Sequence, residues 1–283
     1  MATISELLDY GKWQLEESGN EYAKYERKVL LEHVLSVNYM YMLMNGDENV
    51  AVEKEEQYKK LIEKRKGHYP LQYLLGFTHF MDYTFYIDEN VLIPRNDTEI
   101  LVETVNEMFD NMTCDVEKIK LLDLCCGSGC IGISLKLYHK DIGLTLSDIS
   151  EGALSVTERN LHKYGITDAI INQGSLFEGL HEKYNVIVCN PPYIESAVVG
   201  TLMPEVKDHE PLLALDGGED GLGFYRQIIG ASCEHLLPNG YMYFEIGYNQ
   251  GKEVSGLMSA AGFVDVNIKK DYAGMDRVVY GHL

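Results

Sequence analysis

The chain has 283 residues, of which 46% are hydrophobic and 24% charged, an ordinary balance for a globular protein with one large and one smaller domain. No apolar run approaches the roughly 20 residues that span a bilayer, and the first residues lack a secretion signal, so a cytoplasmic location without membrane contact is expected. The net charge of −20 argues against direct nucleic-acid binding, because that affinity comes mainly from Lys and Arg side chains that neutralise phosphates.

Residues 1–78 are predicted to form a small, all-helical domain. Apolar residues recur there at the spacing of a helix face, as at Leu30, Leu31 and Val34. The stretch 53–66 is rich in Glu and Lys and is typical of an exposed helix face.

Residues 79–97 are predicted to form a β-hairpin that links this domain to the next. From residue 80 to 94 the sequence is rich in aromatic and β-branched residues, which favour strands. Asp88, Glu89 and Asn90 interrupt them with residues typical of turns, so the hairpin turn is expected there.

From residue 98 to 283, short apolar segments typical of strands alternate with segments of helical periodicity. Such alternation predicts a parallel sheet with helices on both faces. Two last strands, at 263–269 and 277–281, are separated by a tight turn, which requires antiparallel pairing. The predicted fold is α/β, with a seven-stranded, mostly parallel sheet whose last strand is antiparallel. The first five strands are expected at 119–124, 143–147, 169–172, 186–189 and 241–246.

A glycine turn follows the first of these strands. Ligands of open α/β sheets bind at the carboxyl ends of the strands, and Gly127 and Gly129 let the backbone turn sharply beside a ligand. The spacing is not Gly-x-Gly-x-x-Gly, which disfavours a dinucleotide. Asp123 either supports the glycine loop or binds the cofactor, and the residues alone leave both roles open. The cofactor candidates here are Asp123, Leu124, Cys125, Cys126, Gly127 and Gly129.

The second strand ends at Asp148, about 20 residues past the glycine turn, where an acid can accept hydrogen bonds from ribose hydroxyls. The alternative is that Asp148 caps the following helix, a role also open to Ser150. The order of these features along the chain favours ribose binding. After the third strand, Leu176 and Phe177 are placed to line an adenine pocket.

The fourth strand runs directly into Asn190, Pro191, Pro192 and Tyr193, called the tetrapeptide below. Consecutive prolines cannot continue a strand ladder, and Pro191 keeps Asn190 out of helical geometry. A rigid extended turn is therefore expected at the edge of the sheet where ligands bind.

The tetrapeptide suits a planar, weakly nucleophilic nitrogen. The Asn190 side-chain oxygen and the Pro191 carbonyl can each accept a hydrogen bond from an –NH₂ group, which orients its lone pair and stabilises developing positive charge. Tyr193 can cover the flat face of that group. Such a site needs no strong general base, and no paired cysteines or Ser/His/Asp set point to a metal or a nucleophile. An amide and an adenine amine both remain open as acceptors.

Other segments are more selective than the tetrapeptide. The chain carries PLQYLLG at 70–76, VLIPRNDTE at 91–99, LDGGEDGL at 215–222 and FEIG at 244–247. Together with the tetrapeptide, these segments resemble the HemK/PrmC family of peptide chain release factor glutamine methyltransferases over nearly the whole chain.

The resemblance implies a Rossmann-like methyltransferase domain at 98–283 that uses S-adenosylmethionine and releases S-adenosylhomocysteine. It implies a helical domain that grips the substrate, a hairpin linker, and a monomer that methylates the glutamine of the GGQ motif in class-1 peptide chain release factors. Asn190, Pro191 and Tyr193 would be catalytic, and the whole tetrapeptide, Pro192 included, would bind the substrate glutamine. The cofactor would also meet Asn190.

Three residues depart from the family pattern: Cys125 stands where a glycine is expected, Leu176 where a Trp is common, and Asn96 where a second proline follows Ile-Pro-Arg. Arg95 follows a strand and precedes a helix start, and it is interpreted as a brace for the linker.

Three other functions stay open. A glutamine methyltransferase of a ribosomal protein would share the tetrapeptide, but segment 215–218 favours release factors. An adenine amino-methyltransferase of DNA or RNA conflicts with the net charge of −20. A cofactor-binding scaffold without catalysis would not need Asn190 and Tyr193.

Overall fold

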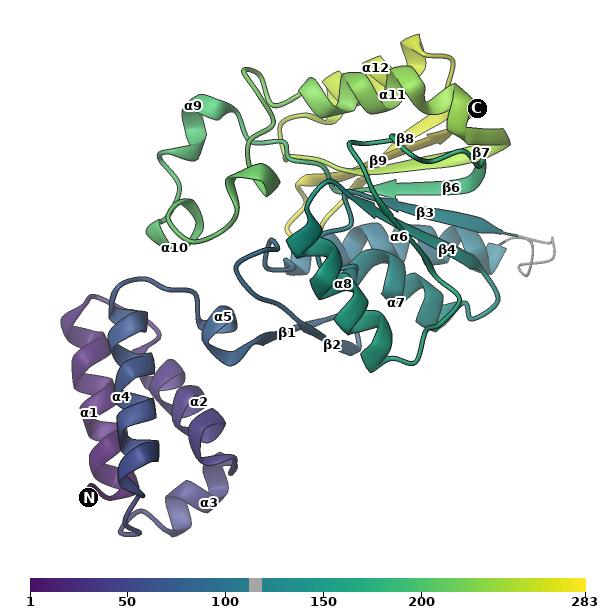
Figure 1. Ribbon diagram of the computed structural model, residues 1–283. Helices are drawn as coiled ribbons and strands as arrows, with labels where there is room; N and C mark the ends of the chain where they lie inside the picture. The colour runs from purple at the N-terminus through teal and green to yellow at the C-terminus, as the bar shows by residue number, and fades with distance from the viewer. Residues whose placement is uncertain (112–118) are drawn as a thin grey trace. The chain divides into compact units, whose positions relative to one another are not determined.

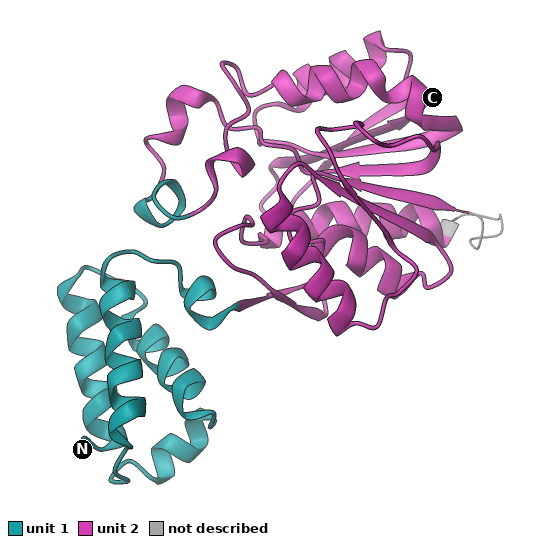
Figure 2. Ribbon diagram, viewed as in Figure 1, with its two compact units in different colours: residues 1–76, 203–209 teal, residues 77–202, 210–283 magenta. Residues whose placement is uncertain are grey.

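The computed structural model describes residues 1–111 and 119–283, with the side chain of residue 111 left out. It divides into two compact units, one of residues 1–76 with 203–209 and one of residues 77–202 with 210–283 (Figure 2). Within the described ranges, no helix is long and apolar enough to cross a membrane.

The first unit is helical, which confirms the predicted small helical domain. Its α1 begins at a capping box, in which Thr3 and Glu6 each bond the other's backbone N–H. The apolar faces of the long helices meet in a core that includes Leu30 and Tyr58, both fully buried. Its helices are α1 (Ile4–Glu17), α2 (Ala23–Leu35), α3 (Tyr39–Met44), α4 (Val52–Lys66), α5 (Leu71–Leu75) and α10 (Pro204–Lys207).

A buried ion pair crosses this unit. Arg65 of α4 donates two hydrogen bonds to the Glu26 carboxylate of α2, at 2.6 and 2.9 Å, and each side chain is only 6% exposed. Arg65 also pairs with Glu205 of α10. The segment 203–209 is therefore bound to helices that lie more than a hundred residues earlier in the chain.

The β-hairpin lies earlier than predicted. Strands β1 (Phe77–Phe80) and β2 (Tyr83–Tyr86) pair antiparallel and turn at residues 81 and 82, so the turn expected at Asp88–Asn90 is wrong. Asp88 does form a turn, because its carboxylate accepts the Asn90 N–H at 3.0 Å. The chain after that turn does not pair back, however, and instead lines the cavity described below.

The second unit is built on a sheet that, in the described chain, has seven strands in the order β5-β4-β3-β6-β7-β9-β8 (Figure 1). The first five run parallel and β9 is antiparallel to both of its neighbours, which confirms the predicted sheet. The strands are β3 (Lys120–Leu124), β4 (Gly143–Asp148), β5 (Ile170–Gln173), β6 (Tyr184–Cys189), β7 (Leu236–Glu245), β8 (Val264–Lys270) and β9 (Asp276–His282).

Helices cover both faces of this sheet, α6, α7 and α8 on one and α11 and α12 on the other (Figure 1). Side chains alternate along each strand, so Leu121 packs into one core while Leu122 packs into the other. Both faces are buried, as the continuous apolar strands require. The helices and short turns are η1 (Asn96–Thr98), α6 (Glu99–Asn111), α7 (Cys130–Tyr138), α8 (Glu151–Lys163), α9 (Ser196–Val199), η3 (Leu212–Ala214), α11 (Gly223–His235) and α12 (Gly251–Ala260).

Candidate active site

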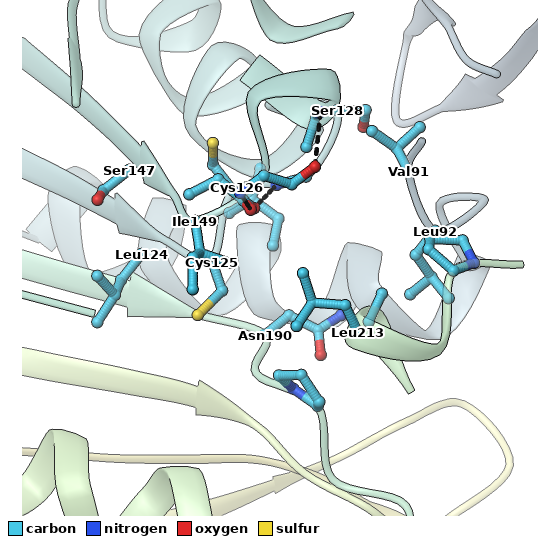
Figure 3. Close-up of a pocket in the computed structure, with 18 of the residues that line it drawn as sticks. Val91, Leu92, Leu124, Cys125, Cys126, Ser128, Ser147, Ile149, Asn190 and Leu213 are labelled. Atoms are coloured by element: carbon cyan, nitrogen blue, oxygen red, sulfur yellow. Dashed lines mark hydrogen bonds between the residues drawn. The ribbon is translucent and has the colours of Figure 1, made fainter. Parts of the chain in front are cut away.

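The site lies at the carboxyl edge of the sheet, where the strand order reverses. β3 pairs with β4 on one side and with β6 on the other, so the chains leaving these strands diverge and open a crevice. A cavity of about 410 Å³ occupies it, lined at the ends of the three strands by Leu124, Ser147 and Asn190 (Figure 3).

The glycine turn forms one wall of this cavity. Cys125, Cys126 and Gly127 line it, and the Cys126 N–H donates to the Ser147 carbonyl at 3.0 Å. Cys125 has φ +60°, a left-handed conformation that costs a non-glycine residue about 1–2 kcal/mol and explains why a glycine suits this position.

Gly129 serves the turn by its shape. Its φ is +75°, and a Cβ there would lie 2.9 Å from the Ile133 Cδ1 and 3.1 Å from the Thr157 Cγ2. It is not among the described residues that line the cavity, so its role is to let α7 start close against the sheet.

Asp148 lies in the cavity wall and also holds the glycine turn. Its Oδ2 accepts the Gly127 N–H and its Oδ1 accepts the Ser150 N–H, both at 2.9 Å. Burial raises the pKa of Asp148, against the effect of these bonds. The cap of α8 is Ser150, whose hydroxyl accepts the Ala153 N–H at 3.2 Å. Asp148 therefore keeps acceptor capacity for a hydroxyl in the cavity.

Asp123 lies behind the cavity wall. It is fully buried, its Oδ2 accepts the Gly132 N–H of α7 at 2.8 Å, and it is not among the described lining residues. Burial raises its pKa to about 7. Of the two roles that the sequence left open, this geometry favours support of the glycine loop.

Leu176 and Phe177, both predicted to line an adenine pocket, point to different places. Leu176 lines the cavity, with φ +51°. Phe177 is not among the described lining residues, and its ring stacks on His235 of α11 at 4.2 Å between centroids. The short turn after β5 sends the two consecutive side chains in different directions.

The tetrapeptide continues β6 at the opposite wall. Asn190 and Pro192 line the cavity, whereas Pro191 and Tyr193 are not among its described lining residues. The Tyr193 hydroxyl donates to the Glu245 Oε1 at 3.3 Å. The structure thus places the Asn190 amide at the cavity and the Tyr193 hydroxyl beside β7.

Sequence reasoning missed the linker wall of the cavity. Asn90, Val91, Leu92 and Pro94 all line it (Val91 and Leu92 are labelled in Figure 3). Glu210, only 1% exposed, holds this segment in place.

The Glu210 Oε2 accepts the Ile93 N–H at 3.2 Å, and the Oε1 pairs with Arg95 at 2.5 Å. Arg95 therefore braces the linker. Pro94 and Arg95 were recognised as a family segment, but no periodicity in the sequence marks residues 90–94 as a cavity wall.

A second, more open cavity of about 560 Å³ adjoins the first. The two share Leu213, Phe224 and Gln227, and the second is otherwise bounded largely by the glycines of segment 217–223. Within the ranges that the structure describes, no group of three His, Cys, Asp or Glu side chains could hold a metal ion.

The sheet order, the antiparallel last strand and the tetrapeptide at the end of β6 define a methyltransferase of Rossmann-like fold. Residues 6–76 match the family model of the PrmC N-terminal domain, and residues 96–205 match that of the methyltransferase small domain.

Relatives that align over nearly the whole chain support the same family. The chain is 40% identical over 280 residues to the release factor glutamine methyltransferase of Clostridium botulinum, covering 98% of each chain. It is 39% identical over 269 residues to that of Clostridium acetobutylicum, covering 94% of this chain and 93% of the relative. The solved methyltransferase of Pyrococcus furiosus shares the fold, with a TM-score of 0.52 over 70% of this chain and 87% of its own at 13% identity. The chain belongs to the release factor glutamine methyltransferase family.

Proposed function

We propose that this protein transfers a methyl group from S-adenosylmethionine to the side-chain amide nitrogen of the glutamine in the GGQ motif of class-1 peptide chain release factors. The observation that carries the proposal is the position of Asn190, whose amide lies at the cavity opposite the glycine turn. The names of the full-length relatives support the release factor as substrate.

The cavity fits the cofactor. The Asp148 carboxylate, desolvated and with acceptor capacity left, suits the ribose hydroxyls, and Gly127 presents backbone without a side chain beside it. Leu176 and Ile149 offer apolar surface to the adenine. Residues 124–127 would then contact the amino-acid end of the cofactor. When bound, S-adenosylmethionine supplies a methyl group on a positively charged sulfur.

The chain's own residues position the acceptor nitrogen. An amide nitrogen is a poor nucleophile because its lone pair is delocalised into the carbonyl. The Asn190 Oδ1 and the Pro191 carbonyl would accept hydrogen bonds from the two N–H groups of this nitrogen. These hydrogen bonds would orient the nitrogen and stabilise the positive charge that develops on it. Asn190 and Pro192 line the cavity, so the nitrogen enters between them and the glycine turn.

The two units have separate roles in this proposal. The helical domain (residues 1–78) would bind the body of the release factor, and the domain after the linker would bind the cofactor and the glutamine. The acidic chain favours a basic protein surface over nucleic acid, and we propose that it acts as a cytoplasmic monomer.

The test incubates the protein with methyl-labelled cofactor and either a release factor or its variant with the GGQ glutamine changed to alanine. Label should appear on the first protein and be absent from the second. Equal labelling of both would contradict the glutamine assignment. Parallel incubations with ribosomal proteins and with DNA or RNA test the other acceptors, and preferential labelling of either would replace the release factor as substrate.

A further inference from the structure

Glu245 is a buried carboxylate beside the tetrapeptide that the proposed chemistry does not use. It is the last residue of β7 and only 1% exposed. The neighbouring Phe244 pairs in register with Cys189, the residue that precedes Asn190. The side chain of Glu245 therefore lies next to the strand end from which the tetrapeptide leaves the sheet.

Its Oε1 accepts a hydrogen bond from the Tyr193 hydroxyl at 3.3 Å. The backbone of Tyr193 is held separately, because its carbonyl accepts the Gln250 side-chain amide at 3.0 Å. A ring that is fixed at its backbone and at its hydroxyl has one orientation, and a buried Tyr hydroxyl needs such a partner. Glu245 supplies the contact at the hydroxyl end.

Among the residues that the structure describes, none forms an ion pair with this carboxylate. Arg277 lies near enough to lower the pKa of Glu245, but its own bonds go to Asp271, Asp97 and the Ile246 carbonyl. Among the described residues the Glu245 Oε2 accepts no well-formed hydrogen bond, and the Thr98 side chain, which lies beside the carboxylate, compensates its burial only in part. A buried carboxylate that forms no ion pair lowers stability, whereas an apolar residue of the same size would avoid that cost. Such a group beside a catalytic turn indicates a functional role.

We propose that Glu245 is a positioning residue for methyl transfer: its Oε1 holds the Tyr193 hydroxyl and thereby keeps the tetrapeptide in the conformation that receives the substrate amide. This inference rests on the proposed function. The carboxylate does not touch the amide, and it acts only through Tyr193.

Two substitutions separate the hydrogen bond from the bulk of the side chain. Glu245→Met keeps the volume and removes the acceptor, whereas Glu245→Gln keeps an acceptor oxygen at the same place. The kcat of Glu245→Met should fall about tenfold with little change in KM, because a displaced tetrapeptide misaligns the amide. Glu245→Gln should recover most of that loss. Glu253→Met, on the exposed face of α12, is the matched control and should behave as wild type.

Combining substitutions tests whether Glu245 acts through Tyr193. Tyr193→Phe alone should lower kcat about as much as Glu245→Met, and adding Glu245→Met to Tyr193→Phe should cause no further loss. Multiplied losses in the double variant would overturn the inference, as would wild-type kcat in Glu245→Met.

The pH profile adds a readout that a purely structural role would not change. Burial raises the pKa of Glu245 to about 7, opposed by Thr98, Arg277 and the Tyr193 hydroxyl. A carboxylate accepts a stronger hydrogen bond than a carboxylic acid, so kcat should rise as pH increases through 7. Glu245→Gln should lose this rise, and an unchanged rise would overturn the inference.

The polar and titratable groups around Glu245 are Thr98 and Asp97 of η1, Tyr193, Arg277 of β9, Cys130 of α7 and Tyr225 of α11.

Hydrogen exchange gives an answer that needs no substrate. The Ile194 N–H donates to the Leu215 carbonyl and the Gly217 N–H to the Ile194 carbonyl, so these amides report on how firmly the tetrapeptide is held. Their exchange should be faster in Glu245→Met than in wild type or Glu245→Gln. If wild type fails to label any release factor, the proposed function is wrong, while equal exchange in all three proteins would refute the role of Glu245.

Discussion

The side chain of Asn190 lies at the cavity, as the sequence predicts, and its oxygen is the proposed acceptor for the substrate amide. Asn190→Ala removes one of the two acceptors for the substrate N–H groups. We expect kcat to fall by about 10²–10³-fold, as for loss of one preorganised hydrogen-bond partner. Cofactor affinity should change little, because Asp148 and the glycine turn remain. Single-turnover rates and calorimetric cofactor binding measure the two effects.

Asn185→Ala provides the control for Asn190→Ala. Asn185 lies in β6, the strand that Asn190 follows, but its Oδ1 accepts the Lys120 N–H at the other end of that strand. This variant should keep both rate and cofactor affinity. Near-normal turnover by Asn190→Ala would refute the proposed role of the Asn190 oxygen.

At the scale of elements, segment 215–222 packs closely against the tetrapeptide and holds it in place, a contact called the clamp below. A Cβ on Gly221 would lie 2.4 Å from the Tyr193 carbonyl oxygen, and one on Gly217 would lie 2.7 Å from the Tyr193 Cα. Residue types larger than glycine do not fit at either place. This contact gives a physical reason for the Leu-Asp-Gly-Gly segment, which by sequence was only a mark of resemblance.

Gly221→Ala should therefore push the tetrapeptide out of place. Gly221 has φ +69° and Gly218 has φ +93°, so alanine is strained at both positions, but a Cβ on Gly218 would have nothing within 4 Å. Both variants should lose about 1 kcal/mol of stability to strain. Only Gly221→Ala should also lower kcat markedly, and equal kcat in the two variants would contradict the clamp. Thermal unfolding and initial rates provide the comparison.

The sheet was predictable because its strands are continuous apolar runs between segments of helical periodicity. This alternation is visible in the sequence without knowledge of tertiary contacts. The hairpin turn was not. Asp88 and Asn90 are typical turn residues, whereas the real turn pairs a single one, Asp82, with Met81, which has φ +51°. Local preference placed a turn correctly at Asp88 but could not say which strands would pair.

The candidate site was likewise predictable only where local sequence decides the position of a residue. Asn190 and Asp148 were found because each ends a strand, and strand ends meet at one edge whatever the side chains do. The directions of Phe177 and Tyr193 depend on contacts with α11 and β7, which are distant in sequence. The linker wall of the cavity depends likewise on Glu210, more than a hundred residues later.

At the scale of the whole molecule, the chain enters the helical unit twice. Residues 1–76 form most of this unit, and residues 203–209, which follow the tetrapeptide in the sequence, also belong to it. The returning segment is fixed by Glu205, which shares Arg65 with the buried Glu26. The segment 203–209, which follows the tetrapeptide in the chain, is thus held by an ion pair within the unit proposed to bind the release factor.

Arg65→Met tests this connection. The substitution leaves the Glu26 carboxylate buried without its partner, which should destabilise the protein by about 3–5 kcal/mol. It should also remove the ion pair that holds Glu205, one of the anchors of residues 203–209 beside the contact of His209 with Tyr69, so a protease should cut there faster. The double variant Arg65→Met, Glu26→Gln should recover much of the stability, because no buried charge remains, but it should stay sensitive to proteolysis because Glu205 still lacks Arg65. Arg226→Met, which breaks an exposed pair with Asp220, should leave stability nearly unchanged. Wild-type resistance to proteolysis in the double variant would show that Arg65 does not hold the returning segment.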